Sequence, residues 1–149
     1  HEAEQVAAAV AQSSAITAFN PHYAQGQQTS VATGLRAAER GSDLLIGLGD
    51  QPLLTRKDLL DLLDSHIAAN ADRISIPVRG EDRGNPIVIP AALRARLLAD
   101  PHSPGCKKFT RANPEHVQFH ALAAPGFFTD VDTPEAYASL IDHRLKESQ

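Results

Sequence analysis

Leu44-Leu45-Ile46-Gly47-Leu48-Gly49-Asp50 is an uninterrupted apolar run that ends in an acidic residue, and this run decides the fold. Such a run, flanked by polar residues, predicts a strand over 44–49 that is buried on both faces of a parallel sheet. Asp50 then follows the carboxyl end of that strand, which is where open α/β sheets bind ligands. The position suits an ordinary turn aspartate equally well. Asp50 is therefore a candidate site residue.

Signals for helices and strands alternate on both sides of this run. Further strands are expected at 16–20, 74–78, 87–89, 117–121 and 127–131, and helices near 2–11, 30–40, 56–67, 93–97, 107–112 and after 133. Strands alternating with helices of about ten or more residues predict a three-layer α/β domain with a mostly parallel sheet. A turn at 80–84 predicts one antiparallel insertion. We expect residues 1–149 to form a single domain.

Two of these helices begin with recognisable caps. Thr55 is a good N-cap, and Thr133 is followed by Pro134, which suits the first position of a helix. The helix after Thr55 is expected to bury the apolar side chains that share one of its faces: Leu59, Leu60, Leu63 and Ile67.

The composition excludes several classes of partner. The chain has 149 residues, of which 42% are hydrophobic and 21% charged, and its formal net charge is −4. This balance argues against a nucleic-acid partner, which needs a basic face. The apolar runs are too short to cross a bilayer, so no membrane partner is expected. The single cysteine, Cys106, is interpreted as an inert thiol in a cytoplasmic protein.

Asp130 and Asp132 are the second candidate site. They alternate with Val131, so an extended segment would place both carboxylates on one face. Carboxylates from separate strand ends are what Mg²⁺ requires, because it takes few protein ligands and keeps water and phosphate oxygens for the rest. The alternative is that both residues only favour the start of the following helix through its dipole.

Two loops could hold a small polar molecule. Arg83-Gly84-Asn85-Pro86 offers backbone donors and a side-chain amide, although a plain turn would have the same composition. The helix start at Ser30 offers free N–H groups to an anion or a base edge, unless it is simply a capped helix. A solvated surface, or a site for a phosphate-bearing small molecule, would explain the arginine cluster: Arg73, Arg79, Arg83, Arg94 and Arg96.

Four motifs, in order, resemble those of the molybdenum-cofactor cytidylyltransferases and related molybdopterin nucleotidyltransferases. Asn20-Pro21-His22-Tyr23-Ala24-Gln25-Gly26, followed by Ser30-Val31 and Gly34-Leu35, is similar to the family's N-P-x-Y-x-x-G-x-x-x-S-[LV]-x-x-G-L. The other three are Leu48-Gly49-Asp50-Gln51-Pro52, Gly84-Asn85-Pro86-Ile87 and Asp130-Val131-Asp132-Thr133-Pro134-Glu135. Together they cover nearly the whole chain.

The resemblance implies a Rossmann-like nucleotidyltransferase that transfers a nucleotide, CMP from CTP, to molybdopterin and releases pyrophosphate. It implies that Asp50 and Asp132 are catalytic and hold Mg²⁺, with Asp130 as a further metal ligand. The nucleotide would be bound by Thr29, Ser30, Gly34 and Gln51. The acceptor would be bound by Gly84, Asn85, Pro86 and Lys107, the last in a Gly105-Cys106-Lys107-Lys108 stretch that replaces the family's G-A-R.

One departure from the family pattern matters. The family begins with a glycine-rich loop, L-A-A-G-x-S-x-R-M-G, which cradles the triphosphate, and the 149 residues contain no such loop. His1-Glu2-Ala3-Glu4 corresponds to the start of the family's second helix. We therefore expect the first βαβ portion to be missing, these residues alone to be inactive, and an exposed strand edge to favour self-association.

Two other functions stay open at this point. The acceptor could be another phosphorylated small molecule, because this fold serves many transferases. The chain could also be a non-catalytic binding module that has no triphosphate loop.

Overall fold

The computed structural model describes residues 2–99 and 106–147, with side chains described as far as residue 142. Contacts divide the chain into two compact units, each described by itself. The first unit comprises residues 1–42 and 90–116, and the second comprises residues 43–89 and 117–149. The expectation of a single domain stays a prediction.

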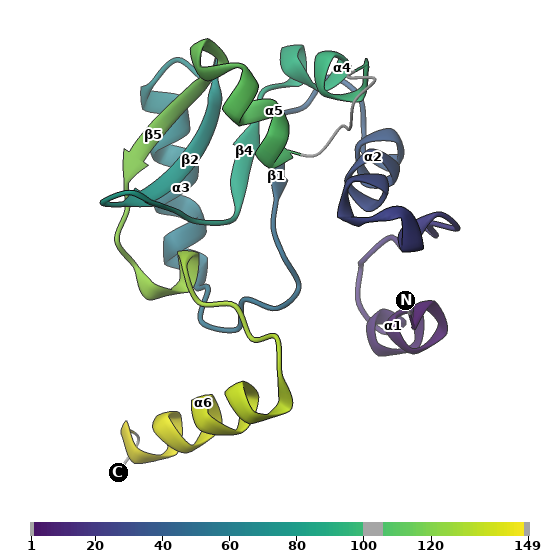
Figure 1. Cartoon of the computed structure of the whole chain (residues 1–149), viewed down its shortest axis with the longest axis vertical. Coiled ribbons are helices and arrows are strands. Elements are labelled where there is room, and N and C mark those ends of the chain that lie inside the picture. The colour runs from purple at the N-terminus through teal and green to yellow at the C-terminus, as the bar shows by residue number, and fades with distance from the viewer. Residues whose placement is uncertain (1, 100–105, 148–149) are drawn as a thin grey trace. The chain divides into compact units, whose positions relative to one another are not determined.

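The second unit contains an open mixed sheet (Figure 1). Within the described residues it has five strands: β1 (Leu44–Ile46), β2 (Ile74–Arg79), β3 (Asp82–Arg83), β4 (Ile87–Ile89) and β5 (Val117–Ala121). β4 lies between β1 and β2 and runs antiparallel to both, whereas β5 runs parallel to β2. β1, β2 and β5 therefore share one direction. The β2–β3 hairpin is the predicted antiparallel insertion, and the α/β class is confirmed. The sheet is mixed and not mostly parallel as predicted, because β4 pairs antiparallel with both of its neighbours.

β1 differs from its prediction in length and burial. It ends at Ile46 instead of continuing to residue 49, and the side chain of Leu45 is 38% exposed. The prediction that this strand is buried on both faces is therefore wrong. The physical reason is its place in the sheet, since it stands at the end of the strand order and pairs with β4 along one side only.

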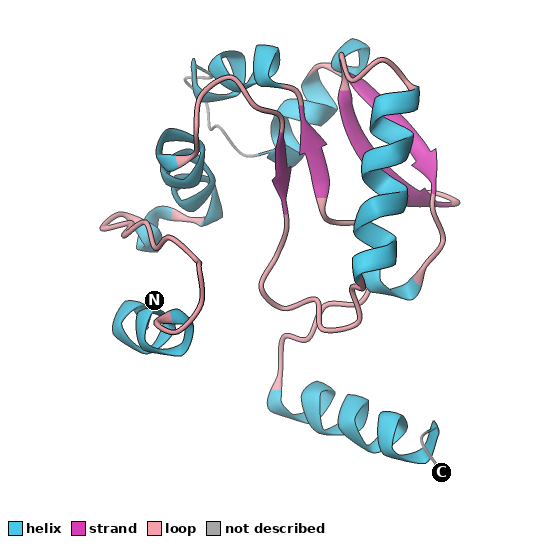
Figure 2. Ribbon diagram, turned by 180° about the vertical axis from the view of Figure 1, so that it is seen from behind, coloured by secondary structure: helices cyan, strands magenta, loops and turns pink. Residues whose placement is uncertain are grey.

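Helix α3 (Arg56–Ala68) covers one face of this sheet (Figure 2). The predicted cap is confirmed: Thr55 and Asp58 form a reciprocal capping box, in which the Thr55 hydroxyl accepts from the Asp58 N–H and the Asp58 carboxylate accepts from the Thr55 N–H. Leu62 packs with Val88 and Phe127 in a fully buried cluster.

The buried stripe of α3 is rotated from the expected one. Its most buried side chains are spaced four residues apart, at Asp58, Leu62 and His66, and Ile67 is 68% exposed. The expectation that Ile67 and Leu60 are buried is wrong, because the capping box and a polar contact of His66 turn the 58–62–66 stripe toward the sheet.

The first unit is helical in its described residues. It holds α1 (Ala3–Val10), a 3₁₀ turn η1 (Tyr23–Gln25), α2 (Gln27–Ala37), α4 (Ala91–Ala99), α5 (Cys106–Ala112) and a 3₁₀ turn η2 (Pro114–His116). The strand expected at 16–20 is absent from this described segment, where Ile16 is 95% exposed. Helix α2 begins earlier than predicted, because Gly26 serves as its N-cap. Gly105, the first residue of the Gly105-Cys106-Lys107-Lys108 stretch, lies outside the described residues.

Arg94 links α4 to the C-terminal end of α2. Its side chain is 7% exposed, and its guanidinium donates to the carbonyls of Leu35 (3.1 Å), Ala38 (3.1 Å) and Ser42 (3.2 Å), and to that of Glu39. These carbonyls have no partner within a helix, and the cation also complements the negative end of the helix dipole. Arg94 is thus a structural residue and does not belong to a solvated basic surface.

The segment from 125 to 134 in the second unit is less regular than predicted. The expected strand at 127–131 is wrong, because the chain forms a 3₁₀ turn η3 (Pro125–Phe127) before an irregular stretch. A Cβ atom at Gly126 would lie 2.7 Å from the Leu53 carbonyl oxygen, so only glycine fits that turn. Helix α6 (Pro134–Glu147) begins as predicted, with the Thr133 hydroxyl accepting from the Ala136 N–H at 3.1 Å. None of the described helices is long and apolar enough to cross a membrane.

Candidate functional site

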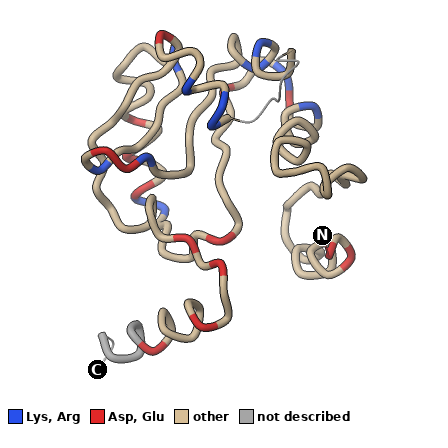
Figure 3. The backbone as a smooth tube through the Cα atoms, in the orientation of Figure 1, with Lys and Arg blue, Asp and Glu red and all other residues tan. Residues whose placement is uncertain are grey.

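The loop that follows β1 is hydrogen-bonded to the segment before α6. The Val131 N–H donates to the Asp50 carbonyl at 2.8 Å, and the Gln51 side-chain amide donates to the Phe127 carbonyl at 3.3 Å. Acidic positions gather where these two segments pass each other (Figure 3). Two of the four sequence motifs therefore meet in space.

The Gly84-Asn85-Pro86 loop joins the same place. The Asn85 N–H donates to the Phe127 carbonyl at 2.9 Å, and the Gly84 N–H donates to the Pro77 carbonyl at 2.8 Å. A Cβ atom at Gly84 would lie 2.6 Å from the Phe127 carbonyl oxygen, so this approach requires glycine. One carbonyl, that of Phe127, therefore accepts from both Asn85 and Gln51.

Two buried oxygens in this site have no hydrogen-bond partner among the described residues. They are Oδ1 of Asp50 and Oε1 of Gln51, and the Gln51 side chain is only 7% exposed. A buried acceptor without a donor costs about 1–3 kcal/mol, so each such group calls for an explanation. Both atoms are acceptors on adjacent residues, an arrangement that favours a bound cation or a donor group from a ligand.

The other two acidic candidates are exposed. Asp130 and Asp132 lie in the irregular stretch, and no described group of three or more His, Cys, Asp or Glu residues is close enough to hold a metal ion. Their alignment on one face of a strand fails, because no strand forms there. The residues still fit Mg²⁺, since this ion binds proteins through one or two carboxylates. Asp50 would supply the first carboxylate, and its unpartnered Oδ1 supports that choice.

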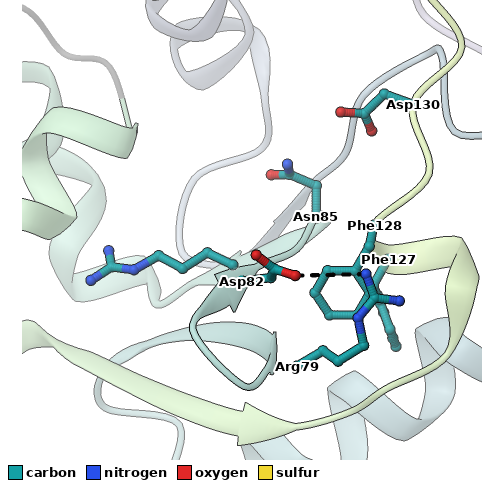
Figure 4. A pocket seen from close by; sticks show the side chains of 7 residues that line it. Arg79, Asp82, Asn85, Phe127, Phe128 and Asp130 are labelled. Atoms are coloured by element: carbon teal, nitrogen blue, oxygen red, sulfur yellow. Dashed lines mark ion pairs between the residues drawn. The ribbon is translucent and has the colours of Figure 1, made fainter.

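A pocket of about 300 Å³ lies beside the Asn85 loop (Figure 4). It is lined by Arg79, Asp82, Arg83, Asn85, Phe127, Phe128 and Asp130. Its floor is aromatic, with the Phe127 and Phe128 rings edge to face at 6.2 Å between centroids. Its rim carries two arginines and two carboxylates. The pocket thus suits a small polar or charged group.

The nucleotide candidates of the N-terminal motif lie in the first unit. The Asn20 side-chain amide donates to the hydroxyls of Thr29 (2.8 Å) and Ser30 (2.9 Å), and Asn20 Oδ1 accepts from the His22 N–H at 3.0 Å. Asn20 and Ser30 also line a cavity of about 790 Å³ that α1 borders. The motif's spacing therefore builds one hydrogen-bonded loop at the start of α2.

The remaining predicted residues fall into both units. Gly34 is exposed on α2, and a Cβ atom there would meet no atom within 4 Å among the described residues. Lys107 is exposed on α5 in the first unit, and Pro86 is buried in the second. The structure thus brings Asp50, Gln51, Gly84 and Asn85 together with the 127–131 segment, and it brings Thr29 and Ser30 together with Asn20.

Sequence reasoning missed three residues of the site. Phe127 was expected in a strand, and Phe128 was not singled out. Arg79 was noted only as one of a cluster of arginines. The signal for Phe127 was its position before Asp130. The loops are joined through its backbone carbonyl and not through its side chain, and no sequence pattern indicates which carbonyl accepts two hydrogen bonds.

A model of the MobA-like NTP transferase domain matches residues 1–118 of the chain. This match includes the loops that carry Thr29, Asp50 and Asn85. A search among curated proteins finds no match.

Proposed function

Since the chain belongs to the MobA-like NTP transferase domain family, we propose that it is part of a Mg²⁺-dependent enzyme that transfers CMP from CTP to molybdopterin. Nucleotidyl transfer from a nucleoside triphosphate is the general activity that the family supports. The choice of CTP, of molybdopterin and of Mg²⁺ is our proposal, and it is supported by the four ordered motifs of the sequence.

In the proposed reaction an oxygen of the acceptor phosphate attacks the α-phosphorus of CTP. A phosphorus–oxygen bond to the acceptor forms, the bond between the α-phosphorus and the oxygen bridging to the β-phosphate breaks, and pyrophosphate leaves with the electron pair. Bound Mg²⁺ supplies neutralisation of the phosphate charge. The chain's part is to position both substrates, and positioning with electrostatics carries most of the catalysis in phosphoryl transfer.

Each motif has a role in this proposal. Asp50 and Asp132 hold the metal, with Asp130 close by in sequence. The nucleotide side is formed by Thr29, Ser30, Gly34 and Gln51. The acceptor side is formed by Gly84, Asn85, Pro86 and Lys107.

The observation that carries the proposal is the meeting of three motifs through two carbonyls, those of Phe127 and Asp50. Asn85 and Gln51 both donate to the Phe127 oxygen, and Val131 donates to the Asp50 oxygen. This network places the proposed metal loop beside the proposed acceptor loop, and it leaves Asp50 Oδ1 without a partner among the described residues. An enzyme that joins a metal-bound nucleotide to an acceptor needs these two loops side by side.

The test is pyrophosphate release by the natural gene product, with molybdopterin as the acceptor and CTP, GTP or ATP as the donor. We expect release with CTP, its loss in Asp50→Ala, and its retention in Asp72→Ala, which removes an exposed carboxylate from the loop before β2. The 149-residue chain alone is expected to be inactive, because it contains no glycine-rich phosphate loop.

Other outcomes would change the proposal. Release only with a different phosphorylated acceptor would keep the transferase and replace molybdopterin. No release with any triphosphate or acceptor, from a protein that still binds nucleotide, would contradict catalysis and favour a binding module.

A further inference from the structure

The pocket beside Asn85 contains an arginine with a weak partner. Arg79 is the last residue of β2, and its guanidinium carbon lies 4.4 Å from the centroid of the Phe128 ring. Its acidic partner is Asp82, with 3.7 Å between Nη2 and Oδ2, and the two side chains are 50% and 70% exposed. An exposed pair at this distance contributes little to stability. The ring positions the cation, while its charge stays poorly neutralised.

The size of the pocket limits what this cation can meet. A volume of about 300 Å³ stands at the lower end of the range for small-molecule sites. Such a space accepts a phosphate and a few adjoining atoms, and it is too small for a whole nucleotide. The planar guanidinium offers two parallel N–H donors that match two phosphate oxygens.

The carboxylates of the pocket determine how a phosphate would enter. Asp82 lies 3.7 Å from one nitrogen of the guanidinium, Nη2, so an incoming phosphate competes with it there. Asp130 lies away from Arg79, on the other side of Asn85 in the view of Figure 4. Arg83 adds a second cation to the lining, with its guanidinium 4.8 Å from the Phe119 ring centroid. Arg79, which is stacked on the Phe128 ring that lines the pocket, is therefore the cation that an anion in the pocket would meet first.

We infer that Arg79 binds the phosphate group of the acceptor and exchanges Asp82 for it, so that Arg79 and Asp82 set the charge that the acceptor must carry. This inference rests on the proposed function and names a residue outside the four motifs. A neutral acceptor would leave the Arg79–Asp82 pair intact, and it would gain no binding free energy from the Arg79 charge. The acceptor class is thus a phosphate monoester held next to Asn85.

The experiment measures binding of phenyl phosphate, with phenol as the neutral comparison, to the isotope-labelled 149-residue chain by NMR. We expect phenyl phosphate to shift the Arg79 Nε–H and Asn85 N–H signals and phenol to leave them unchanged. Arg79→Gln should weaken phenyl phosphate binding about tenfold, which corresponds to the loss of one charge-assisted contact. Asp82→Asn should strengthen it several-fold, because the competing carboxylate is gone.

A matched pair elsewhere in the same unit provides the control. Arg73 and Asp72 form an exposed pair at 3.5 Å, with side chains 48% and 64% exposed. Arg73→Gln and Asp72→Asn should leave phenyl phosphate binding unchanged. Arg79→Lys keeps the charge without the planar fork and should give intermediate affinity, which provides a second readout if Arg79→Gln does not fold.

The opposite signs of the two variants separate the inference from a structural role. If the Arg79–Asp82 pair only stabilised the hairpin, both variants would weaken binding together, and that result would overturn the inference. Equal binding of phenol would also overturn it. Binding is measured without nucleotide, so phosphate binding with no pyrophosphate release would contradict the proposed function and leave the anion site standing.

Discussion

The polar cluster around Ser75 and the pair Asp50–Gln51 both contain buried polar atoms in the second unit, and they differ in how far the hydrogen bonds of these atoms are satisfied. The Ser75 hydroxyl is fully buried and lies 2.8 Å from His66 Nδ1, 2.9 Å from Gln118 Nε2 and 2.9 Å from His120 Nε2. Asp50 and Gln51 each keep one buried oxygen without a partner among the described residues.

The contacts of the Ser75 cluster determine where its protons lie. The Asp43 carboxylate, 3.3 Å from His66 Nε2, can only accept, so Nε2 carries the hydrogen and Nδ1 accepts from the Ser75 hydroxyl. The Ser75 oxygen then accepts from Gln118 and from His120. The Ser75 hydroxyl thus donates one hydrogen bond and accepts two, and α3, β2 and β5 are joined through one oxygen.

The difference indicates which buried polar groups stabilise the fold and which serve a ligand. A saturated network rigidifies the elements that it joins, whereas an unsatisfied buried acceptor costs free energy until a ligand pairs with it. We therefore expect substitutions at Ser75 to change stability, and substitutions at Asp50 to change activity. The four predictions that follow test this contrast, from the largest expected effect to the smallest.

Asp50→Asn should lower pyrophosphate release by the natural gene product about 10³-fold, because it removes the charge that holds the metal; this corresponds to about 4 kcal/mol in the activation free energy. Its free energy of unfolding should change by no more than about 0.5 kcal/mol. Steady-state kinetics and urea unfolding check the two parts. A large decrease in the free energy of unfolding would show that Asp50 stabilises the fold, as the Ser75 cluster does.

Ser75→Ala should lower the free energy of unfolding by about 2–3 kcal/mol, because it leaves buried partners on His66, His120 and Gln118 without their shared oxygen. Urea unfolding measures this. The matched control is Ser65→Ala on α3, whose hydroxyl only donates to the Asp61 carbonyl one turn earlier at 2.7 Å. That change should have almost no effect. An equal change in the free energy of unfolding for both serine variants would contradict the claim that the Ser75 cluster stabilises the fold.

Stability should fall as the pH drops below about 6.5, the ordinary pKa of histidine. Burial, and secondarily the charge of His66, lower the pKa of His120 in the folded protein. The unfolded chain therefore takes up a proton at this position at a pH where the folded chain does not, and protonation favours unfolding. The contribution of His120 to the free energy of unfolding is fully present above its pKa in the unfolded chain. It decreases as the pH falls from that value toward the lower pKa of the folded protein.

The measurement is the urea midpoint at pH 7.5 and at pH 5.5. His120→Gln keeps a donor to Ser75 without the titration, and it should reduce the difference between the two midpoints. An unchanged difference would show that another group causes the pH dependence.

Gln51→Met should change the free energy of unfolding by less than about 1 kcal/mol. The substitution removes the unpaired Oε1 together with a long hydrogen bond of 3.3 Å, and the Phe127 carbonyl keeps its bond from Asn85. The effect on stability is read from thermal unfolding. A loss as large as that of Ser75→Ala would remove the distinction between the two regions.

Local signals in the sequence predicted the elements that local physics determines. The caps at Thr55 and Thr133 depend on residues within three positions, and both formed as predicted. The strand at 117–121 formed over its predicted length, because its β-favouring residues find a parallel partner in β2. The structure also brings the motif loops of Asp50 and Asn85 together at the Phe127 carbonyl, whereas the roles of these residues stay predictions.

Features that depend on distant residues escaped sequence reasoning. The apolar residues at 127–131 resemble a strand, but Gly126 packs against Leu53 and Leu54 and a 3₁₀ turn forms instead. Arg94 looked like a surface cation, although its partners lie 52 to 59 positions earlier in the chain. The Ser75 network draws on α3, β2 and β5, so no periodic pattern could reveal it.

The Arg94 contacts have a consequence for how the chain is made. Both units are discontinuous, since residues 43–89 interrupt the first and residues 90–116 interrupt the second. During synthesis α2 leaves the ribosome well before Arg94, so the carbonyls at its end are hydrated until α4 arrives. The second unit likewise waits for β5 before β2 gains its parallel neighbour. Each unit therefore completes its packing late in synthesis. We expect proteases to cleave α2 in a nascent chain stalled before residue 94, and to cleave it more slowly in the finished chain.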